Sequence, residues 1–129
     1  MAEKLKPEHI FPTDKRVDLT GLLELTGHDK TLVLKYTGIF LSTVPRQLDN
    51  IQKALAQVDG NLLYQAIHIL KPQLELMGIK IALHEVQILQ ALLEEKREIR
   101  EAVKKSAGFI VSEINLACKE LEVIQKGYP

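Results

Sequence analysis

Apolar residues recur at spacings of three and four along most of this chain, and this periodicity constrains the fold more than any other feature. Such spacings place side chains on one face of an α-helix, and each apolar face then needs a partner to cover it. The stripes are separated by turn signals at Gly27, at Asp59-Gly60 and at Gly78. No stretch of useful length alternates like a half-buried strand. The sequence therefore predicts an all-α domain, and its four long stripes predict an antiparallel four-helix bundle.

The first two expected helices follow from local start and stop signals. A short apolar cluster at residues 17–25, ended by Gly27, predicts a short N-terminal helix that caps the bundle. The next helix begins after Asp29, a favourable N-cap residue. Pro45 removes one of its hydrogen-bond donors, so we expect a kink or two successive helices near Ser42–Pro45. The buried stripe expected for this helix is Leu32, Tyr36, Ile39 or Phe40, Val44, Leu48, Ile51 and Leu55.

Three further stripes complete the expected core. The helix after Asp59 is expected to bury Leu63, Ile67, Leu70, Leu74 and Met77. The helix after Gly78 is expected to bury Ala82, Val86, Leu89 and Leu93, with Ile81, Ile88 and Leu92 widening its buried side. After a turn near Glu95–Glu98, the last helix is expected to bury Ile99, Val103, Ala107, Ile110, Ile114, Ala117, Leu121 and Ile124.

Length and charge limit the class of protein. The chain has 129 residues, which suits one domain, and we expect a helical-bundle domain over residues 16–126 behind a flexible arm at residues 1–15. Lys plus Arg and Asp plus Glu number 17 each, so no excess of positive charge directs the chain to nucleic acid. No apolar run approaches the ~20 residues of a membrane span, and the N-terminus lacks the apolar core of a signal peptide. The lone Cys118 suits a reducing compartment, so we expect a cytoplasmic protein, with a monomer favoured.

One histidine departs from this simple picture. At about 100° per residue, His68 lies roughly 140° from the buried direction of its helix, so its side chain is expected in solvent. Tyr64, Lys71 and Glu75 fall on the same exposed side. A neutral imidazole nitrogen is a good nucleophile at physiological pH, because histidine has an ordinary pKa of about 6.5. A phosphoryl group on that nitrogen adds nearly two negative charges, which a lysine one turn away partly neutralises.

The surrounding segment adds a family resemblance. Residues 59–78 read DGNLLYQAIHILKPQLELMG, which resembles the active helix of histidine-containing phosphotransfer (HPt) domains, the intermediate carriers of multistep two-component phosphorelays. The family pattern is His-x-Leu-Lys with a glycine about ten residues after the histidine. The matching residues here are His68, Leu70, Lys71 and Gly78. The stretch before residue 59 also resembles the preceding helices of the family, and the resemblance covers most of residues 17–124.

The resemblance implies a function and a set of site residues. His68 would be the phosphoacceptor, Lys71 would stabilise the added charge, and Gln90 on the following helix would hydrogen-bond the imidazole or its phosphoryl group. The implied partners are a hybrid sensor kinase and the receiver domain of a response regulator, which brings its own aspartate and Mg²⁺. The rim that the partner touches would comprise Tyr64, Gln65, Pro72, Glu75 and Gly78.

Two residues depart from the family pattern. Glycine usually follows the lysine, where this chain has Pro72, and alanine usually precedes the histidine, where this chain has Ile67. Both departures bear on how a receiver domain docks, and neither removes the nucleophile.

Other kinds of site find little support in the sequence. It has no Gly-rich phosphate loop and no carboxylate cluster, so we expect a carrier without ATP binding or autokinase activity and with no cofactor of its own. His84-Glu85 begins like a zinc-protease motif, but Ile88 stands where the second histidine is needed, so no metal site is expected.

Three alternative functions remain to be weighed. The main alternative is a non-phosphorylated helical adaptor that binds a receiver domain or another signalling partner. A helical enzyme subunit or ligand carrier is disfavoured because no polar cluster converges inside the expected core. A coiled-coil assembly factor is disfavoured because Pro45, Gly60, Pro72 and Gly78 interrupt the stripes.

Overall fold

The computed structural model describes residues 16–127, and within them all regular secondary structure is helical. The flexible arm expected at residues 1–15 lies outside the described residues. The helices are α2 (Thr20–Thr26), α3 (Lys30–Gln57), α4 (Gly60–Leu76), α5 (Lys80–Glu95) and α6 (Glu101–Gly127). The prediction of an all-α chain is therefore confirmed for the described part.

The helix ends follow the capping residues that the sequence offers. Asp29 precedes α3 and accepts hydrogen bonds from the backbone N–H groups of Thr31 and Leu32. Asp59 precedes α4 and accepts one from the N–H of Leu62. Gly27 ends α2 in the left-handed conformation, with a φ of 64°, which costs glycine little because it has no Cβ. These signals are local, so the sequence predicted them correctly.

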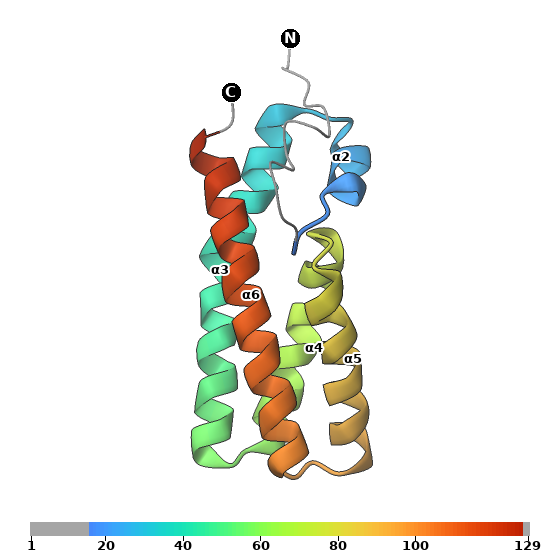
Figure 1. Ribbon diagram of the computed structural model, residues 1–129, viewed down its shortest axis with the longest axis vertical. Coiled ribbons are helices and arrows are strands. Elements are labelled where there is room, and N and C mark those ends of the chain that lie inside the picture. The colour runs from blue at the N-terminus through green and yellow to red at the C-terminus, as the bar shows by residue number, and fades with distance from the viewer. Residues whose placement is uncertain (1–15, 128–129) are drawn as a thin grey trace.

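The four longer helices cover one another in a cyclic order. α3 contacts α4 and α6, and α5 contacts the same two helices. In Figure 1, α3 and α6 follow the long axis of the molecule, while the shorter α4 and α5 stand beside them. α2 lies beyond the turn that joins α4 to α5, at the upper end of the view. This arrangement leaves one long side of α4 facing solvent.

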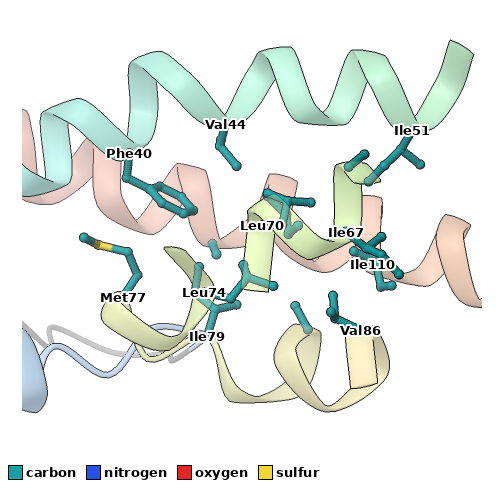
Figure 2. Close-up of a cluster of buried hydrophobic side chains, with 14 of the residues drawn as sticks. Phe40, Val44, Ile51, Ile67, Leu70, Leu74, Met77, Ile79, Val86 and Ile110 are labelled. Carbon is teal, nitrogen blue, oxygen red and sulfur yellow. The ribbon is translucent and has the colours of Figure 1, made fainter. Parts of the chain in front are cut away.

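The core consists mainly of aliphatic side chains from all of these helices. Figure 2 shows Phe40 and Val44 of α3 facing Leu70 and Leu74 of α4 and Met77, which directly follows α4. The stripes predicted for α4 and α6 are buried throughout, and so are Ala82, Val86, Leu89 and Leu93 of α5. The periodicity therefore identified the inward face of three helices correctly.

The expected stripe of α3 is partly wrong. Of the two alternatives Ile39 and Phe40, Phe40 is the buried one. Leu32, however, is exposed, and the first half of α3 also buries Val33 and Thr37. The expectation that Ile81 and Ile88 widen the buried side of α5 is also wrong, because both are exposed. In each case two apolar residues are adjacent, as in Leu32-Val33 and Ile88-Leu89, so two helical faces match the pattern, and packing against the partner helices selects one of them.

Two prolines lie inside helices without dividing them. α3 passes through Pro45 as one helix, so of the two alternatives expected near Ser42–Pro45, a kink or two successive helices, the second is wrong. α4 passes through Pro72 in the same way. In the turn before Pro45, the Ile39 carbonyl accepts hydrogen bonds from Ser42 Oγ at 3.0 Å and from Thr43 Oγ1 at 2.8 Å. Proline removes a donor from the helix, and α3 and α4 nevertheless continue past Pro45 and Pro72.

The segment before α2 is fastened to two other elements. The backbone N–H groups of Arg16 and Val17 donate to the Glu120 carboxylate of α6, with the Arg16 nitrogen 2.9 Å from Oε2. Arg16 also pairs with the buried Glu113 at 3.5 Å. The Asp18 N–H donates to the Met77 carbonyl at 3.2 Å. These contacts hold residues 16–19 against α6 and the turn between α4 and α5.

None of the described helices combines the length and the apolar character that crossing a membrane would require.

Candidate functional site

Helix α4 places His68 on its outer side. Leu63, Ile67 and Leu70 are fully buried and fix the rotation of the helix about its axis. Because successive residues of a helix are about 100° apart, the residue that follows Ile67 turns away from the core. The His68 side chain is exposed, as the sequence predicted. A partner protein can therefore reach the imidazole without any change in the fold.

Lys71 and Glu75 continue this outer side toward the end of α4. Lys71 is half-buried and lies three residues after His68, and Glu75 is exposed one turn further on. Within residues 16–127, neither of them takes part in an ion pair. The Lys71 ammonium is thus not committed to a carboxylate of the described fold and is available for an anion beside His68.

Tyr64 lies one turn before His68 and has the most contacts of the group. Its ring is nearly parallel to the His68 imidazole, with an interplanar angle of 9° and 6.3 Å between the ring centroids. Its hydroxyl donates to Glu94 Oε1 of α5 at 3.1 Å. The Tyr64 side chain therefore connects the outer side of α4 to α5, and it borders the imidazole on one side.

Gln90 contacts this tyrosine and not the imidazole. Its Nε2 donates to the Tyr64 hydroxyl at 3.5 Å, a long hydrogen bond. The family resemblance implies that Gln90 bonds the imidazole or its phosphoryl group. In this structure Gln90 is half-buried on α5, and its contact with the site is the hydrogen bond to the Tyr64 hydroxyl.

Arg97 is a member of the group that the sequence analysis missed. The guanidinium carbon lies 3.7 Å from the centroid of the Tyr64 ring, and Nη1 donates to the Leu93 carbonyl at 2.9 Å. Arg97 stands in the charge-rich run EEKREIREAVKK, where many side chains are equally suitable candidates. No local signal distinguishes it, because its contact with Tyr64 depends on how the linker after α5 passes the start of α4.

The expected rim residues have different surroundings. Gln65, Pro72 and Glu75 are exposed. Pro72 and Glu75 also line a shallow hollow of about 370 Å³ between α4 and α2, together with Gly21, Leu25 and Leu76. The hollow joins the outer side of α4 to α2, and Leu25 is among the most exposed large apolar side chains of the described chain.

Gly78 has a packing role in this structure. Its φ is +62°, and a Cβ at this position would collide with the carbonyl of Asp18. Only glycine adopts this conformation readily and also leaves room for the neighbouring backbone. Gly78 thus allows the segment before α2 to approach the turn after α4, and it lies beneath that segment.

A second hollow of about 570 Å³ lies between α3 and α6, and no residue of α4 lines it. Its lining includes Leu41, Pro45 and Leu48 of α3 and Cys118 of α6. Burial, with a smaller contribution from Glu122, raises the pKa of the Cys118 thiol to about 11. The thiol is therefore protonated at neutral pH and is a poor nucleophile there.

Within residues 16–127, no group of three or more His, Cys, Asp or Glu side chains is arranged to hold a metal ion. His84 is exposed, and the neighbouring Glu85 accepts a hydrogen bond from Ser106 Oγ of α6 at 2.7 Å. The His84-Glu85 pair thus contributes to helix packing through its glutamate.

Comparisons of this chain with protein-family models, with curated proteins and with solved structures found no match.

Proposed function

We propose that this chain is a phosphorelay intermediate that carries a phosphoryl group on His68. The observation that carries the proposal is an exposed imidazole on a rigidly packed helix, with the uncommitted Lys71 ammonium one turn away. A nucleophile that exchanges phosphate with other proteins must be both accessible and fixed in direction. The resemblance of residues 59–78 to the active helix of HPt domains supports the same role.

The proposed reaction is a reversible transfer between an aspartate and a histidine. A neutral imidazole nitrogen of His68 attacks the phosphorus of an aspartyl phosphate on a receiver domain, in line with the bond to the carboxylate oxygen. The nitrogen–phosphorus bond forms, the phosphorus–oxygen bond breaks, and the aspartate leaves as a carboxylate. Lys71 faces the charge that arrives on the imidazole, and Mg²⁺ belongs to the receiver domain. In this proposal the chain is a carrier and has no autokinase activity.

The proposed scaffold is an antiparallel four-helix bundle of α3, α4, α5 and α6, with α2 as a short capping helix. The cyclic contacts of the four helices support it. A bundle suits a carrier because it fixes α4 from one side and leaves the other side open to a large partner.

The proposed partner surface extends from His68 along the outer side of α4. Gln65, Pro72 and Glu75 are exposed beside the imidazole, and the hollow next to α2 continues this surface. The partners are the receiver domain of a response regulator and a hybrid sensor kinase. We place the carrier with them in the cytoplasm, as a monomer.

Labelling by a phosphorylated receiver domain tests the proposal. We expect the chain to acquire phosphate that is labile in acid and stable in alkali, as a phosphohistidine is. His68→Gln should abolish the label and leave the helical circular dichroism unchanged. The matched control is His84→Gln, which removes another exposed histidine from α5 and should leave labelling intact. Labelling that persists in His68→Gln would assign the phosphoacceptor to another residue.

Lys71→Ala tests the second part of the site. We expect slower transfer or a shorter phosphate lifetime, because the ammonium no longer offsets the added charge. Lys53→Ala, which removes an exposed lysine from α3, provides the control for net charge. Transfer rates and lifetimes equal to those of the unmodified chain would remove Lys71 from the mechanism.

A non-phosphorylated adaptor is the second candidate function. The observation that favours it is Pro72, which is exposed beside Lys71 and lines the apolar hollow that contains Leu25. An adaptor would bind a receiver domain with no phosphate appearing on His68, and binding would survive His68→Gln. Titration of the same receiver domain by calorimetry, alongside the labelling experiment, separates the two functions.

A further inference from the structure

Tyr64 connects the proposed phosphoacceptor to an arginine that the sequence did not single out. The guanidinium of Arg97 lies over the Tyr64 ring, with 3.7 Å between Cζ and the ring centroid. Its ring is also nearly parallel to the imidazole of His68, at a centroid distance of 6.3 Å. Offset aromatic pairs commonly have centroids about 4.5–7 Å apart, so the tyrosine ring limits the orientations open to the imidazole.

The tyrosine is itself held from several directions. Its hydroxyl donates to Glu94 and accepts from Gln90, both on α5. Arg97 is fixed in turn, because its Nη1 donates to the Leu93 carbonyl. Its backbone is packed as well, since a Cβ at Gly60 would collide with the Arg97 carbonyl. The start of α4 and the linker after α5 are thus in direct contact, and this contact sets the place of the guanidinium.

Two physical routes could connect Arg97 to His68. One is the direct effect of its charge, and the other is mechanical and passes through the tyrosine ring. These two distances place the guanidinium carbon within about 10 Å of the imidazole centroid, which is about one Debye length at 0.1 M salt. At an exposed site such a charge is largely screened, whereas the stacking contact is direct.

We infer that Tyr64 is a positioning residue for His68 and that Arg97 acts on the imidazole by holding the Tyr64 ring in place. This inference rests on the proposed phosphotransfer function, since it assigns the two residues a part in that reaction. The imidazole is bordered on the Tyr64 side, so the phosphoryl group reaches it from the side of Lys71. Gln90 contributes by fixing the tyrosine hydroxyl.

Nuclear magnetic resonance of the unphosphorylated chain tests the positioning directly. The ring current of Tyr64 shifts the carbon-bound ring protons of His68, and Tyr64→Leu removes this shift. We expect Arg97→Ala to move the His68 resonances part of the way toward their Tyr64→Leu positions, because the ring is released. Resonances of His68 that stay in place in Arg97→Ala would overturn the inference. This readout needs no phosphate, so it is independent of whether the proposed function is correct.

Arg97→Lys separates stacking from charge. The lysine keeps the positive charge but lacks the planar group that covers the ring. We expect its His68 resonances and its transfer rate to match those of Arg97→Ala. Restoration of both to the values of the unmodified chain would show that the charge acts directly and would contradict the proposed route.

A double-mutant cycle on the transfer rate completes the test. We expect Tyr64→Leu to slow transfer from a phosphorylated receiver about tenfold at saturating receiver, since small errors in orientation have large effects on reaction rates. Arg97→Ala should slow it less, and the double variant should be no slower than Tyr64→Leu alone. Effects that multiply in the double variant would mean that the two residues act independently. Tyr64→Phe keeps the ring but loses the hydroxyl that contacts Glu94 and Gln90, so its rate should lie between those of the unmodified chain and Tyr64→Leu.

Discussion

Two groups of ionisable side chains on this molecule have different surroundings. On α6, Glu113 and Glu120 bind Arg16 and the backbone of the segment before α2. On the outer side of α4, His68 and Lys71 face outward with no ion pair to the described chain. The carboxylates of α6 are bound within the fold, whereas His68 and Lys71 remain available to another molecule.

The difference shows where to look for function on a helical surface. A charged residue that another part of the chain satisfies is explained by the stability of the fold. A nucleophile and a cation that face outward together from a well-packed helix contribute little to stability and remain available for chemistry. Variants of the first group should therefore alter stability, and variants of the second should alter phosphate transfer.

Among the variants that test the docking of the segment before α2, Gly78→Ala should have the largest effect on stability. A side chain there must adopt a φ near +62° and collides with the Asp18 carbonyl, so the segment before α2 must move. We expect a loss of at least about 2 kcal/mol in the free energy of unfolding, measured in urea. Gly108→Ala is the matched control, because a Cβ there meets nothing within 4 Å and alanine favours the helix. Equal stabilities of the two variants would mean that the packing of residues 16–19 against Gly78 adds nothing to the free energy of unfolding.

Glu120→Ala should have the next largest effect. It removes the acceptor of the backbone N–H groups of Arg16 and Val17. We expect a loss of about 1–2 kcal/mol in the free energy of unfolding. Glu122→Ala removes an exposed carboxylate from the same helix and should change stability by less than about 0.5 kcal/mol. Similar losses in both variants would mean that the hydrogen bonds from Arg16 and Val17 to Glu120 add nothing to the free energy of unfolding.

Asp18 should make the free energy of unfolding depend on pH in the acid range. The Thr20 hydroxyl, Lys80 and the Thr20 N–H hydrogen-bond its carboxylate and lower its pKa from 3.8 to about 2. Because the folded pKa is the lower one, the stabilisation is complete above about pH 3.8 and disappears as the pH falls toward 2. Asp18→Asn should flatten this part of the stability profile, measured by urea unfolding between pH 2 and pH 5. Thr20→Ala should flatten it more than Lys80→Ala, since the hydroxyl is the largest cause; the reverse order would contradict the assignment.

His68→Gln and Lys71→Ala should have the smallest effect on stability. His68 is exposed, and Lys71 is half-buried without an ion pair in the described chain, so each variant should unfold within about 0.5 kcal/mol of the unmodified chain. Leu70→Ala provides the contrast on the same helix, because Leu70 is fully buried and its loss should cost about 2–5 kcal/mol. A cost above about 1 kcal/mol for His68→Gln would show that the histidine supports the fold and would break the comparison between the two regions.

The orientation of the site was predictable because it depends on local geometry. Once Leu63, Ile67 and Leu70 are assigned to the core, the direction of His68 follows from the helical repeat. The partners of the tyrosine were not predictable in this way. Gln90 could have reached the imidazole or the tyrosine hydroxyl, and only the placement of α5 beside α4 determines that it donates to Tyr64.

By itself the sequence determined the all-helical class, most helix boundaries and the inward faces of α4 and α6, because capping and periodicity act between residues a few positions apart. Only the tertiary structure decided that Val33 and Thr37 enter the core while Leu32 stays outside. Gln125 of α6 supplies a partner for the buried Thr37, because its side-chain amide donates hydrogen bonds to the Thr37 hydroxyl and to the Leu34 carbonyl. Tertiary packing likewise brought Arg97 to Tyr64. A contact between residues far apart in the chain depends on the relative placement of whole helices, and no local pattern in the sequence contains that placement.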